Sequence, residues 1–252
     1  MECEDKDIAK AAEWVRGARR IAVLTGAGIS AESGLPTFRG PGGLWRSFRP
    51  EELATPQAFA ADPRLVWEWY DWRRSVHAKV EPNAGHRALA DLGRRAGEFS
   101  LITQNVDSLH EAAGSRAVVH LHGSLWTLRC TRCGKEEMNR QVPLEPLPPV
   151  CECGAMQRPG VVWFGEPLPD KPLAQALAAA QKAEVMLVVG TSSMVYPAAA
   201  LPKVARDSGA KVIEVNPEET EMTLAAHASV RGKAGEVLPE IMARVTRDGP
   251  GK

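Results

Sequence analysis

The chain has 252 residues, 44% of them hydrophobic, and its 31 basic side chains balance its 31 acidic ones. This composition is typical of a globular protein with one large domain, or one domain with an insertion, and it gives no indication of a nucleic-acid or anionic-membrane partner. Because no apolar run approaches the length of a membrane span and the first residues lack a signal peptide's apolar stretch, we expect a cytoplasmic protein without membrane contacts.

Short apolar runs alternate along the chain with helical patterns. The helices are expected at Asp7–Arg19, His86–Arg95, Ser108–Ala113, Pro172–Gln181, Ala198–Ser208 and Glu236–Arg244. The strands are expected at Ile21–Thr25, Phe99–Thr103, Val118–His122, Val185–Val189 and Lys211–Val215. Continuously apolar strands between helices are typical of parallel sheets covered on both faces. The pattern therefore predicts an α/β fold with a Rossmann-like, doubly wound parallel sheet.

Two segments interrupt this alternation. Residues from about 40 to 85 contain Trp67, Trp69 and Trp72 and have a helical pattern. Residues 126–159 contain four cysteines and the proline-rich stretch Pro143–Pro149. We expect these insertions, 40–85 and 126–159, to form a smaller domain with a helical and a zinc-binding module. Residues 1–39, 86–125 and 160–252 would then form the Rossmann-like domain.

Four of the five cysteines form two close pairs, Cys130 with Cys133 and Cys151 with Cys153. In a cytosolic chain this clustering favours a metal over disulfides, and two thiolate pairs on short turns suit tetrahedral zinc. Free or redox-active thiols are the alternative. Four sulfur ligands leave no open position for a substrate, so this zinc is expected to be structural. Cys3 stands apart from the cluster.

The loop after the first expected strand begins with Gly26-Ala-Gly28. Glycine adopts backbone angles closed to other residues, and the second glycine lets the main chain approach a pyrophosphate. A Gly-x-Gly pair alone occurs in many loops. Here, however, Phe38 and Arg39 follow at a distance that does not fit a standard dinucleotide turn, and the third glycine of that fingerprint is replaced by Ala31.

Polar side chains follow the second expected strand, at Gln104, Asn105 and Asp107. Ligands bind at the carboxyl ends of the strands in open α/β sheets, so these residues could face a nucleotide. Alternatively, the Asn and Asp side chains could simply cap the following helix. The residues alone favour neither interpretation.

Most histidines are structural, and the chain has six of them: His77, His86, His110, His120, His122 and His227. His120 and His122 alternate on an expected strand and so share one of its faces. His122 directly precedes Gly123, at the end of that strand.

From about residue 8 to residue 245 the chain resembles the sirtuins, NAD-dependent protein deacylases. The resemblance rests on the run from Gly26 to Arg39, the string T-Q-N-x-D-x-L-H ending at His110, and the pair His122-Gly123. It continues, in the order of the family, through the segments Arg158–Glu166, Gly190–Ser192, Asn216–Glu218 and Gly232–Ala234.

The resemblance implies that NAD is consumed as a co-substrate, giving nicotinamide, O-acyl-ADP-ribose and a free lysine. It assigns His122 as the general base on the ribose hydroxyls and Asn105 as the residue that positions water or ribose. His120 would be a packing residue, and His110 would support the loop. The implied NAD-binding residues are Gly26, Ala27, Gly28, Ser30, Phe38, Arg39, Gln104, Asn105, Asp107, Gly190, Thr191, Ser192, Asn216 and Ala234.

The implied partner is an acyl-lysine protein, bound as an extended peptide. A peptide could pair as an added strand with the segment from Arg158 to Glu166, although this segment could also be an ordinary edge strand. The residues assigned to the substrate on this ground are Val162, Trp163, Phe164, Gly165, Glu166 and Val195.

Ala54 with Tyr70 and Arg73 resembles the sirtuin class that removes succinyl and malonyl groups. In that class the small alanine widens the acyl pocket, while the tyrosine and the arginine bind the distal carboxylate. Three residues apart on a helix, Tyr70 and Arg73 share a face. Without the resemblance, the favoured interpretation is that Tyr70 packs with the tryptophans and Arg73, like Arg74, is solvated.

Two other functions remain as alternatives. A dehydrogenase on the same fold would transfer a hydride to or from a small substrate, but no hydride-transfer constellation is evident. A zinc-bearing nucleic-acid-binding or scaffold module would bind NAD without releasing nicotinamide, and the balanced charge disfavours it.

Overall fold

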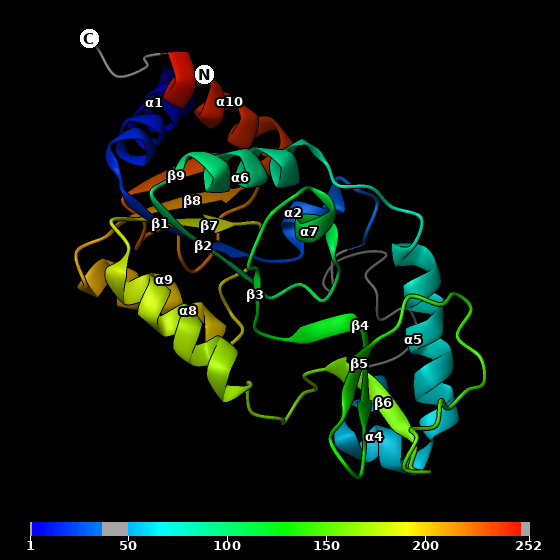
Figure 1. Cartoon of the computed structure of the whole chain (residues 1–252). Helices are drawn as coiled ribbons and strands as arrows, with labels where there is room; N and C mark the ends of the chain where they lie inside the picture. The colour runs from blue at the N-terminus through cyan, green and yellow to red at the C-terminus, as the bar shows by residue number, and fades with distance from the viewer. Residues whose placement is uncertain (1, 37–49, 248–252) are drawn as a thin grey trace.

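A parallel sheet forms the centre of the larger part of the molecule (Figure 1). The computed structural model describes residues 2–36 and 50–247, and within them the sheet has six strands in the order β3-β2-β1-β7-β8-β9. Their bounds are β1 Arg20–Thr25, β2 Glu98–Thr103, β3 Val119–His120, β7 Val185–Val189, β8 Lys211–Asn216 and β9 Ala228–Arg231. The five predicted strands are thus confirmed, with β3 shorter than expected. The edge strand β9 was not predicted.

Helices cover both faces of this sheet, as its apolar strands require. The helices α1 (Glu2–Gly17), α6 (Ala84–Arg95) and α10 (Ala234–Arg247) lie on one face, at the top of Figure 1. The helices α8 (Asp170–Lys182) and α9 (Leu201–Asp207), the latter preceded by the 3₁₀ turn η1 (Ala198–Ala200), lie on the other. In β1, Ile21 and Val23 pack into the first of the two resulting cores, and Ala22 packs into the second. The doubly wound arrangement is confirmed.

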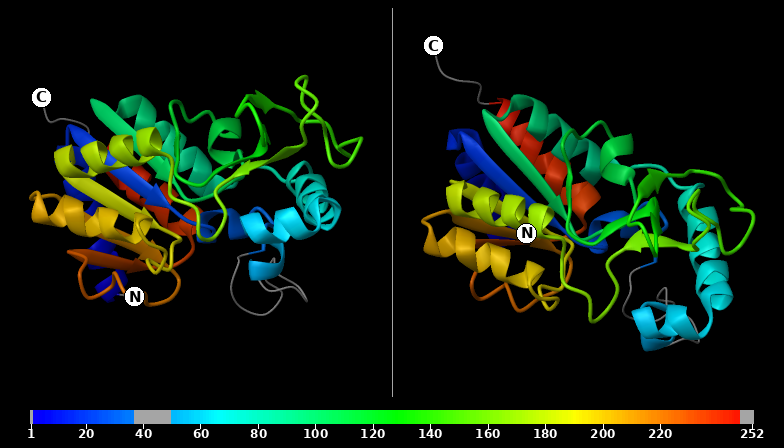
Figure 2. Two further views of the ribbon diagram at one scale, coloured as in Figure 1. Left: turned by 90° about the horizontal axis from the view of Figure 1, so that it is seen from below. Right: turned by 60° about the horizontal axis from the view of Figure 1, so that its bottom comes forward.

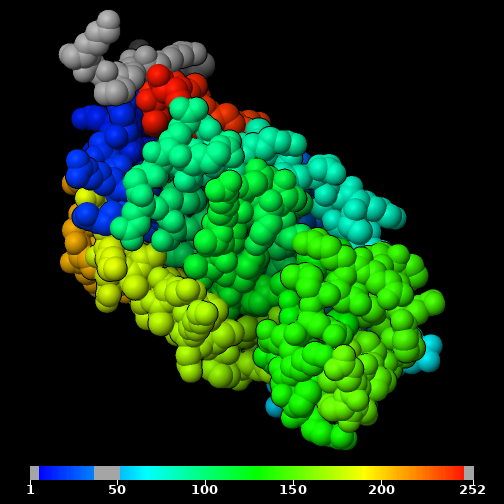
Figure 3. Space-filling view, in the orientation of Figure 1, coloured from blue at the N-terminus to red at the C-terminus, as the bar shows by residue number. Residues whose placement is uncertain are grey.

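A second, smaller body lies beside the sheet (Figure 2). It contains the antiparallel sheet β5-β4-β6, made of β4 (Gly123–Cys130), β5 (Glu136–Met138) and β6 (Gln157–Val161). The helices α3 (Pro50–Leu53), α4 (Pro56–Ala61) and α5 (Pro63–His77) pack with this sheet around one apolar cluster that includes Trp67, Trp163 and Leu128. Strand β4 runs across the expected boundary between residues 125 and 126. In the space-filling view this body is a separate lobe of the surface (Figure 3).

Local sequence signals set the ends of the helical segment. The Thr55 hydroxyl accepts a hydrogen bond from the Ala58 amide, and the Asp62 carboxylate accepts one from the Leu65 amide. A proline follows each of these caps, where its fixed φ suits a helix start and its missing N–H costs no hydrogen bond. Helices α4 and α5 are therefore separated at Asp62, which ends the first and caps the second.

Arg74 joins α5 to the zinc-binding segment and is fully buried. Its guanidinium donates to the carbonyl oxygens of Leu125 (2.9 Å), Asn139 (2.8 Å) and Gln141 (3.0 Å). Arg73 is also buried, over the rings of Trp69 and Tyr70. The interpretation in which both arginines are solvated is therefore wrong, because the backbone carbonyls and aromatic rings of the small body replace water around them.

His77, the last residue of α5, generates a pH prediction. The residues that the structure describes offer its two ring nitrogens no hydrogen-bond partner, and burial, followed by the charge of Arg73, lowers its pKa to about 3. An unfolded histidine titrates near 6.5, so the unfolded chain binds the extra proton first and stability is lost as pH falls below 6.5. Between pH 7 and pH 5 the free energy of unfolding should fall by about 2 kcal/mol because of this residue.

Replacing His77 by Phe should remove that part of the pH dependence. Urea unfolding at pH 7 and pH 5 measures the change in the free energy of unfolding. His227→Phe, at a less buried position beside the large sheet, is the matched variant. An equal loss of stability in the wild type and in His77→Phe would contradict the prediction.

Candidate functional site

Two strand-to-helix turns meet closely where β1 and β7 end. The Gly26 amide donates to the Val189 carbonyl (3.0 Å), and the Gly28 amide donates to the Gly190 carbonyl (2.8 Å). A Cβ at Gly28 would lie 2.7 Å from the Cα of Gly190, and Gly190 itself has a φ of +59°. These glycines are therefore required for the two backbones to approach, and they bring the short helix α2 (Gly28–Ala31) to the carboxyl edge of the sheet.

Asn105 and Asp107 lie against this turn. The Asn105 side-chain amide donates to the Gly26 carbonyl (3.1 Å) and to the Ser30 hydroxyl (3.2 Å). The Ser30 hydroxyl in turn donates to the Asp107 carboxylate (2.9 Å), whose other oxygen accepts from the Leu109 amide (3.0 Å). The Asp107 carboxylate thus accepts from the first amide of α7 (Leu109–Ala112) and also contacts the glycine loop through Ser30. Burial raises the pKa of Asp107, against the effect of its hydrogen bonds.

The ends of β2, β7 and β8 are linked by side-chain amides. Gln104 donates through Nε2 to the Thr191 hydroxyl (2.9 Å), and Asn216 donates through Nδ2 to the Thr191 carbonyl (3.0 Å). Ser193 is buried, and its hydroxyl has no hydrogen-bond partner among the residues the structure describes. This edge therefore offers uncharged polar groups, including one buried hydroxyl available to a ligand.

His122 lies next to this edge and half-buried. Its Nδ1 is 2.8 Å from the carbonyl oxygen of Gln104, which can only accept, so Nδ1 carries the proton and Nε2 has a free lone pair. Burial lowers the pKa of His122, although the bond to Gln104 acts in the opposite direction. The His122 carbonyl accepts from the Val162 amide (2.9 Å). The imidazole is therefore neutral at neutral pH and lies beside the segment assigned to the substrate.

The neighbouring histidines are placed differently. His120 contacts the Glu111 carboxylate. Burial alone would lower the pKa of His120, but the hydrogen bond to Glu111 and the negative charge of Glu111 outweigh burial, so the pKa is raised. His110 is buried, and its Nε2 lies 2.9 Å from the Thr25 hydroxyl. Burial lowers the pKa of His110 well below the usual value. His120 is thus a partly buried residue that also pairs with Glu111, whereas His110 joins its helix to β1.

Two further groups at this edge were not found from the sequence. His86 contacts Ser30 through Nε2 (3.5 Å), and burial lowers its pKa to about 4. The buried Glu214 carboxylate on β8 accepts from the hydroxyls of Thr220, Thr223 and Ser229 and from Arg231. The sequence signal for Glu214 was a glutamate inside an otherwise apolar strand. Its hydrogen bonds fix the loop after Asn216 against β9.

The residues assigned to the acyl group and the peptide lie on the small body. Ala54, Tyr70 and Trp163 share one apolar cluster, and the Phe164 amide donates to the Ala54 carbonyl (2.9 Å). Phe164 and Val195 are exposed, whereas Ala234 is buried in the core at the start of α10. Gly165 has a φ of +84°. Strand β6 lies at the edge of its sheet, which confirms that interpretation for the first part of the segment. Its outer side is covered: the Gln157 carbonyl accepts from the Trp67 indole, and the Val161 carbonyl accepts from Arg158. Phe38 and Arg39 lie outside the described residues.

The four paired cysteines come together at the end of β4. Their sulfur atoms all lie within 4.8 Å of one another, with Cys130 and Cys153 3.5 Å apart and Cys133 and Cys151 3.8 Å apart. Four sulfurs bound to one zinc at 2.3 Å are about 3.8 Å apart, so this donor set fits a closed tetrahedral site. The predicted zinc cluster is therefore supported by its geometry.

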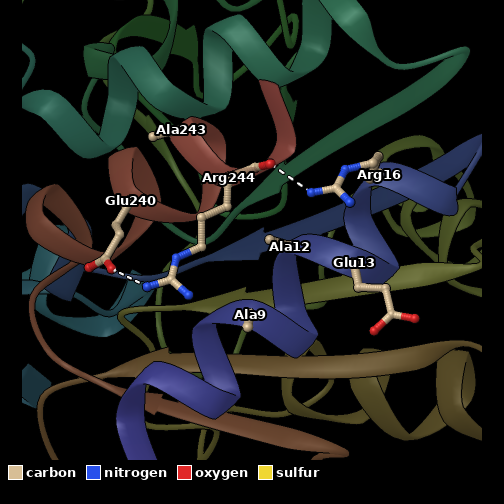
Figure 4. Close-up of a pocket in the computed structure, with 7 residues that line it drawn as sticks. All are labelled: Ala9, Ala12, Glu13, Arg16, Glu240, Ala243 and Arg244. Carbon is tan, nitrogen blue, oxygen red and sulfur yellow. Dashed lines mark hydrogen bonds and ion pairs between the residues drawn. The ribbon is translucent and has the colours of Figure 1, made fainter. Parts of the chain in front are cut away.

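A groove of about 570 Å³ lies between the N- and C-terminal helices, on the side of the sheet opposite to α8 and α9 (Figure 4). Across it, Arg16 of α1 donates to the Arg244 carbonyl of α10 (2.7 Å), and along α10 Arg244 pairs with Glu240 (2.8 Å). None of the residues that line it belongs to the polar edge described above: Ala9, Ala12, Glu13, Arg16, Glu240, Ala243 and Arg244.

The doubly wound sheet with polar groups at its carboxyl edge defines a nucleotide-binding α/β protein. The chain belongs to the Sir2 family, whose model matches residues 26–197. It is 55% identical over 222 residues to an NAD-dependent protein deacylase of Aquifex aeolicus, covering 88% of this chain and 93% of the relative. The resemblance drawn from the sequence motifs is confirmed.

Solved structures agree with this family. The structure of a Sir2 homologue–NAD complex has a TM-score of 0.90 and is 50% identical, covering 94% of this chain and 93% of that one. A Sir2 structure bound to a myristoylated histone peptide has a TM-score of 0.77 and is 39% identical, covering 96% of this chain and 98% of that one. No helix among the described residues is long and apolar enough to cross a membrane.

Replacing Cys130 and Cys133 by Ala should remove the metal, because two ligands cannot hold structural zinc. Metal analysis should find about one zinc per chain in the wild type and in Cys3→Ala, and none in the double variant. The small body should unfold, because structural zinc contributes directly to the free energy of folding. Active protein purified without zinc would contradict this assignment.

Proposed function

We propose that this Sir2-family chain is an NAD-dependent protein-lysine deacylase that acts on acetyl-, malonyl- and succinyl-lysine. The observation that carries the proposal is the orientation of His122. Its Nδ1–H is bound by the Gln104 carbonyl, its Nε2 has no hydrogen-bond partner among the described residues, and its backbone pairs with the segment assigned to the peptide. The finding that relatives are named NAD-dependent protein deacylases supports this reaction over hydride transfer.

The polar edge of the sheet suits NAD. The buried Ser193 hydroxyl has no partner among the described residues, and Gln104, Thr191 and Asn216 surround the same strand ends. When bound, NAD supplies the ADP-ribosyl group that accepts the acyl group, with nicotinamide as the leaving group. The loop Gly26–Ser30, with Asn105 and Asp107 behind it, would hold the phosphate and ribose end. Gly190, Ser192 and Ala234 are assigned to the same cofactor.

The chain's own contribution is a proton acceptor that lies among neutral polar groups. Because burial lowers its pKa, His122 is unprotonated at neutral pH and can take a proton at Nε2 from a ribose hydroxyl. Asn105, fixed by Gly26 and Ser30, is proposed to orient water or ribose. The neutral, buried His86 and His110 add no competing charge.

An extended peptide is proposed to pair with Val162–Glu166 on one side and with the segment around Val195 on the other. Ala54 would leave room for the acyl chain. Tyr70 and Arg73 are proposed to bind a distal carboxylate. They lie on one face of α5, and the Arg73 guanidinium lies 5.5 Å from the centre of the Tyr70 ring. Burial lowers the pKa of Arg73, but Arg73 is near enough to Asp107, which lies against the glycine loop, for the charge of Asp107 to act in the opposite direction on this pKa.

His122→Ala should reduce deacylation by about 10²–10⁴-fold, because the general base is lost while the cofactor loops stay intact. Nicotinamide release measures turnover, and NAD binding by calorimetry should be retained. His227→Ala removes a histidine outside the site and serves as the control. Near-native turnover in His122→Ala would exclude this role.

Arg73→Met should lower kcat/KM for succinyl-lysine about 10- to 100-fold more than for acetyl-lysine, because a hydrogen bond to a charged group is worth ~1.5–3 kcal/mol. Tyr70→Phe should shift the preference in the same direction by less, since it removes one neutral donor. Matched acetyl-, malonyl- and succinyl-lysine peptides measure the effect. Equal losses on all three would mean that the pair is structural and that the chain is a plain deacetylase.

A further inference from the structure

Trp163 lies between the peptide segment and helix α5. Its indole Nε1 donates to the Tyr70 hydroxyl oxygen at 2.9 Å. Both side chains are almost fully buried, Trp163 being 3% exposed and Tyr70 2%. The bond therefore connects the residue that follows Val162 in the substrate segment to the residue proposed to bind the acyl carboxylate.

The neighbours of Tyr70 decide what its hydroxyl can do. Arg73 lies close to it, with the guanidinium carbon 5.5 Å from the centre of the Tyr70 ring. An indole N–H and a guanidinium only donate, so neither Trp163 nor Arg73 can accept the hydroxyl's own hydrogen. Burial raises the pKa of Tyr70, so the hydroxyl keeps this hydrogen at neutral pH. The oxygen accepts from Trp163, and the hydroxyl's hydrogen is left for a third group.

The indole is itself held in place. The Arg158 guanidinium carbon lies 3.4 Å from the centre of the Trp163 ring, and its two terminal nitrogens donate to the Glu166 carboxylate at 2.6 and 2.9 Å. Glu166 also accepts from the Trp163 backbone amide at 2.8 Å. The Phe59 ring also packs on the indole, with the two ring centres 5.3 Å apart. A stacked guanidinium with a bidentate carboxylate fixes both the plane of the indole and its backbone.

We propose that Trp163 is a positioning residue for acyl selectivity: held by Arg158 and Glu166, it turns the Tyr70 hydroxyl so that its hydrogen points to the distal carboxylate of a dicarboxylic acyl group. This inference rests on the proposed binding of such a group by Tyr70 and Arg73. It adds that selectivity is set partly by the peptide segment, outside the helix that carries the pair. An acetyl group has no distal carboxylate and gains nothing from this orientation.

Trp163→Phe tests the proposal, because it removes the N–H and keeps an aromatic ring beside Arg158 and Phe59. The ratio of kcat/KM for succinyl-lysine to that for acetyl-lysine should fall about three- to tenfold, as expected for loss of one neutral hydrogen bond. The fall should lie mainly in KM for the succinyl peptide. In a Tyr70→Phe background, Trp163→Phe should leave the ratio unchanged, because the group that it orients is gone.

Trp67→Phe is the matched control. Trp67 belongs to the same apolar cluster, and its indole donates instead to the Gln157 carbonyl at 2.8 Å. Its loss should therefore affect both substrates equally. Arg158→Lys, which removes the planar stack and the bidentate pair, is the second variant if Trp163→Phe does not fold, and it should lower the same ratio.

The outcomes separate the two proposals. If Tyr70→Phe and Arg73→Met lower the ratio but folded Trp163→Phe does not, this inference is overturned and the proposed carboxylate recognition stands. If none of the Tyr70 and Arg73 variants changes the ratio, the recognition itself fails. A further fall of the ratio in the Tyr70→Phe background would show that Trp163 acts by another route and would also overturn the inference.

Discussion

The close contact of three glycine backbones is the constraint on which the rest of the site depends. A side chain at Gly26, Gly28 or Gly190 would place a Cβ within 2.8 Å of a backbone atom of the facing turn. With those turns apart, Asn105 would lose its bond to the Gly26 carbonyl, and the bond from Gln104 to the Thr191 hydroxyl would be strained. The polar edge therefore depends first on the packing of these main-chain turns, which place the polar side chains.

Burial then decides the charge of this edge. His86 and His110 are neutral because the core around them disfavours a cation. The same burial disfavours an anion and raises the pKa of Asp107. His120, whose ring is paired with Glu111, is the exception. His122 shares the lowered pKa but keeps a free ring nitrogen, which is the property required of a base.

The sequence predicted the large sheet well and the small one poorly, for a physical reason. Long apolar strands such as Val185–Val189 are buried on both faces and have an unmistakable pattern. Strand β5, Glu136–Met138, is short, fully exposed and held mainly by its pairing with β4, so its composition carries no signal. The burial of Arg73 and Arg74 was likewise hidden, since the carbonyls and rings that surround them come from distant segments.

The bonds of Arg74 have a consequence for how the small body responds to its metal. The carbonyls of Asn139 and Gln141, which Arg74 binds, belong to the stretch of chain between the two cysteine pairs. Arg73 and Tyr70 precede Arg74 on the same helix. Disorder that began at the cysteines would therefore strip a buried cation of its acceptors and reach the acyl pocket, while the glycine turns remained intact. Loss of zinc would thus disturb the proposed acyl pocket first, while the turns proposed to hold NAD stay in place.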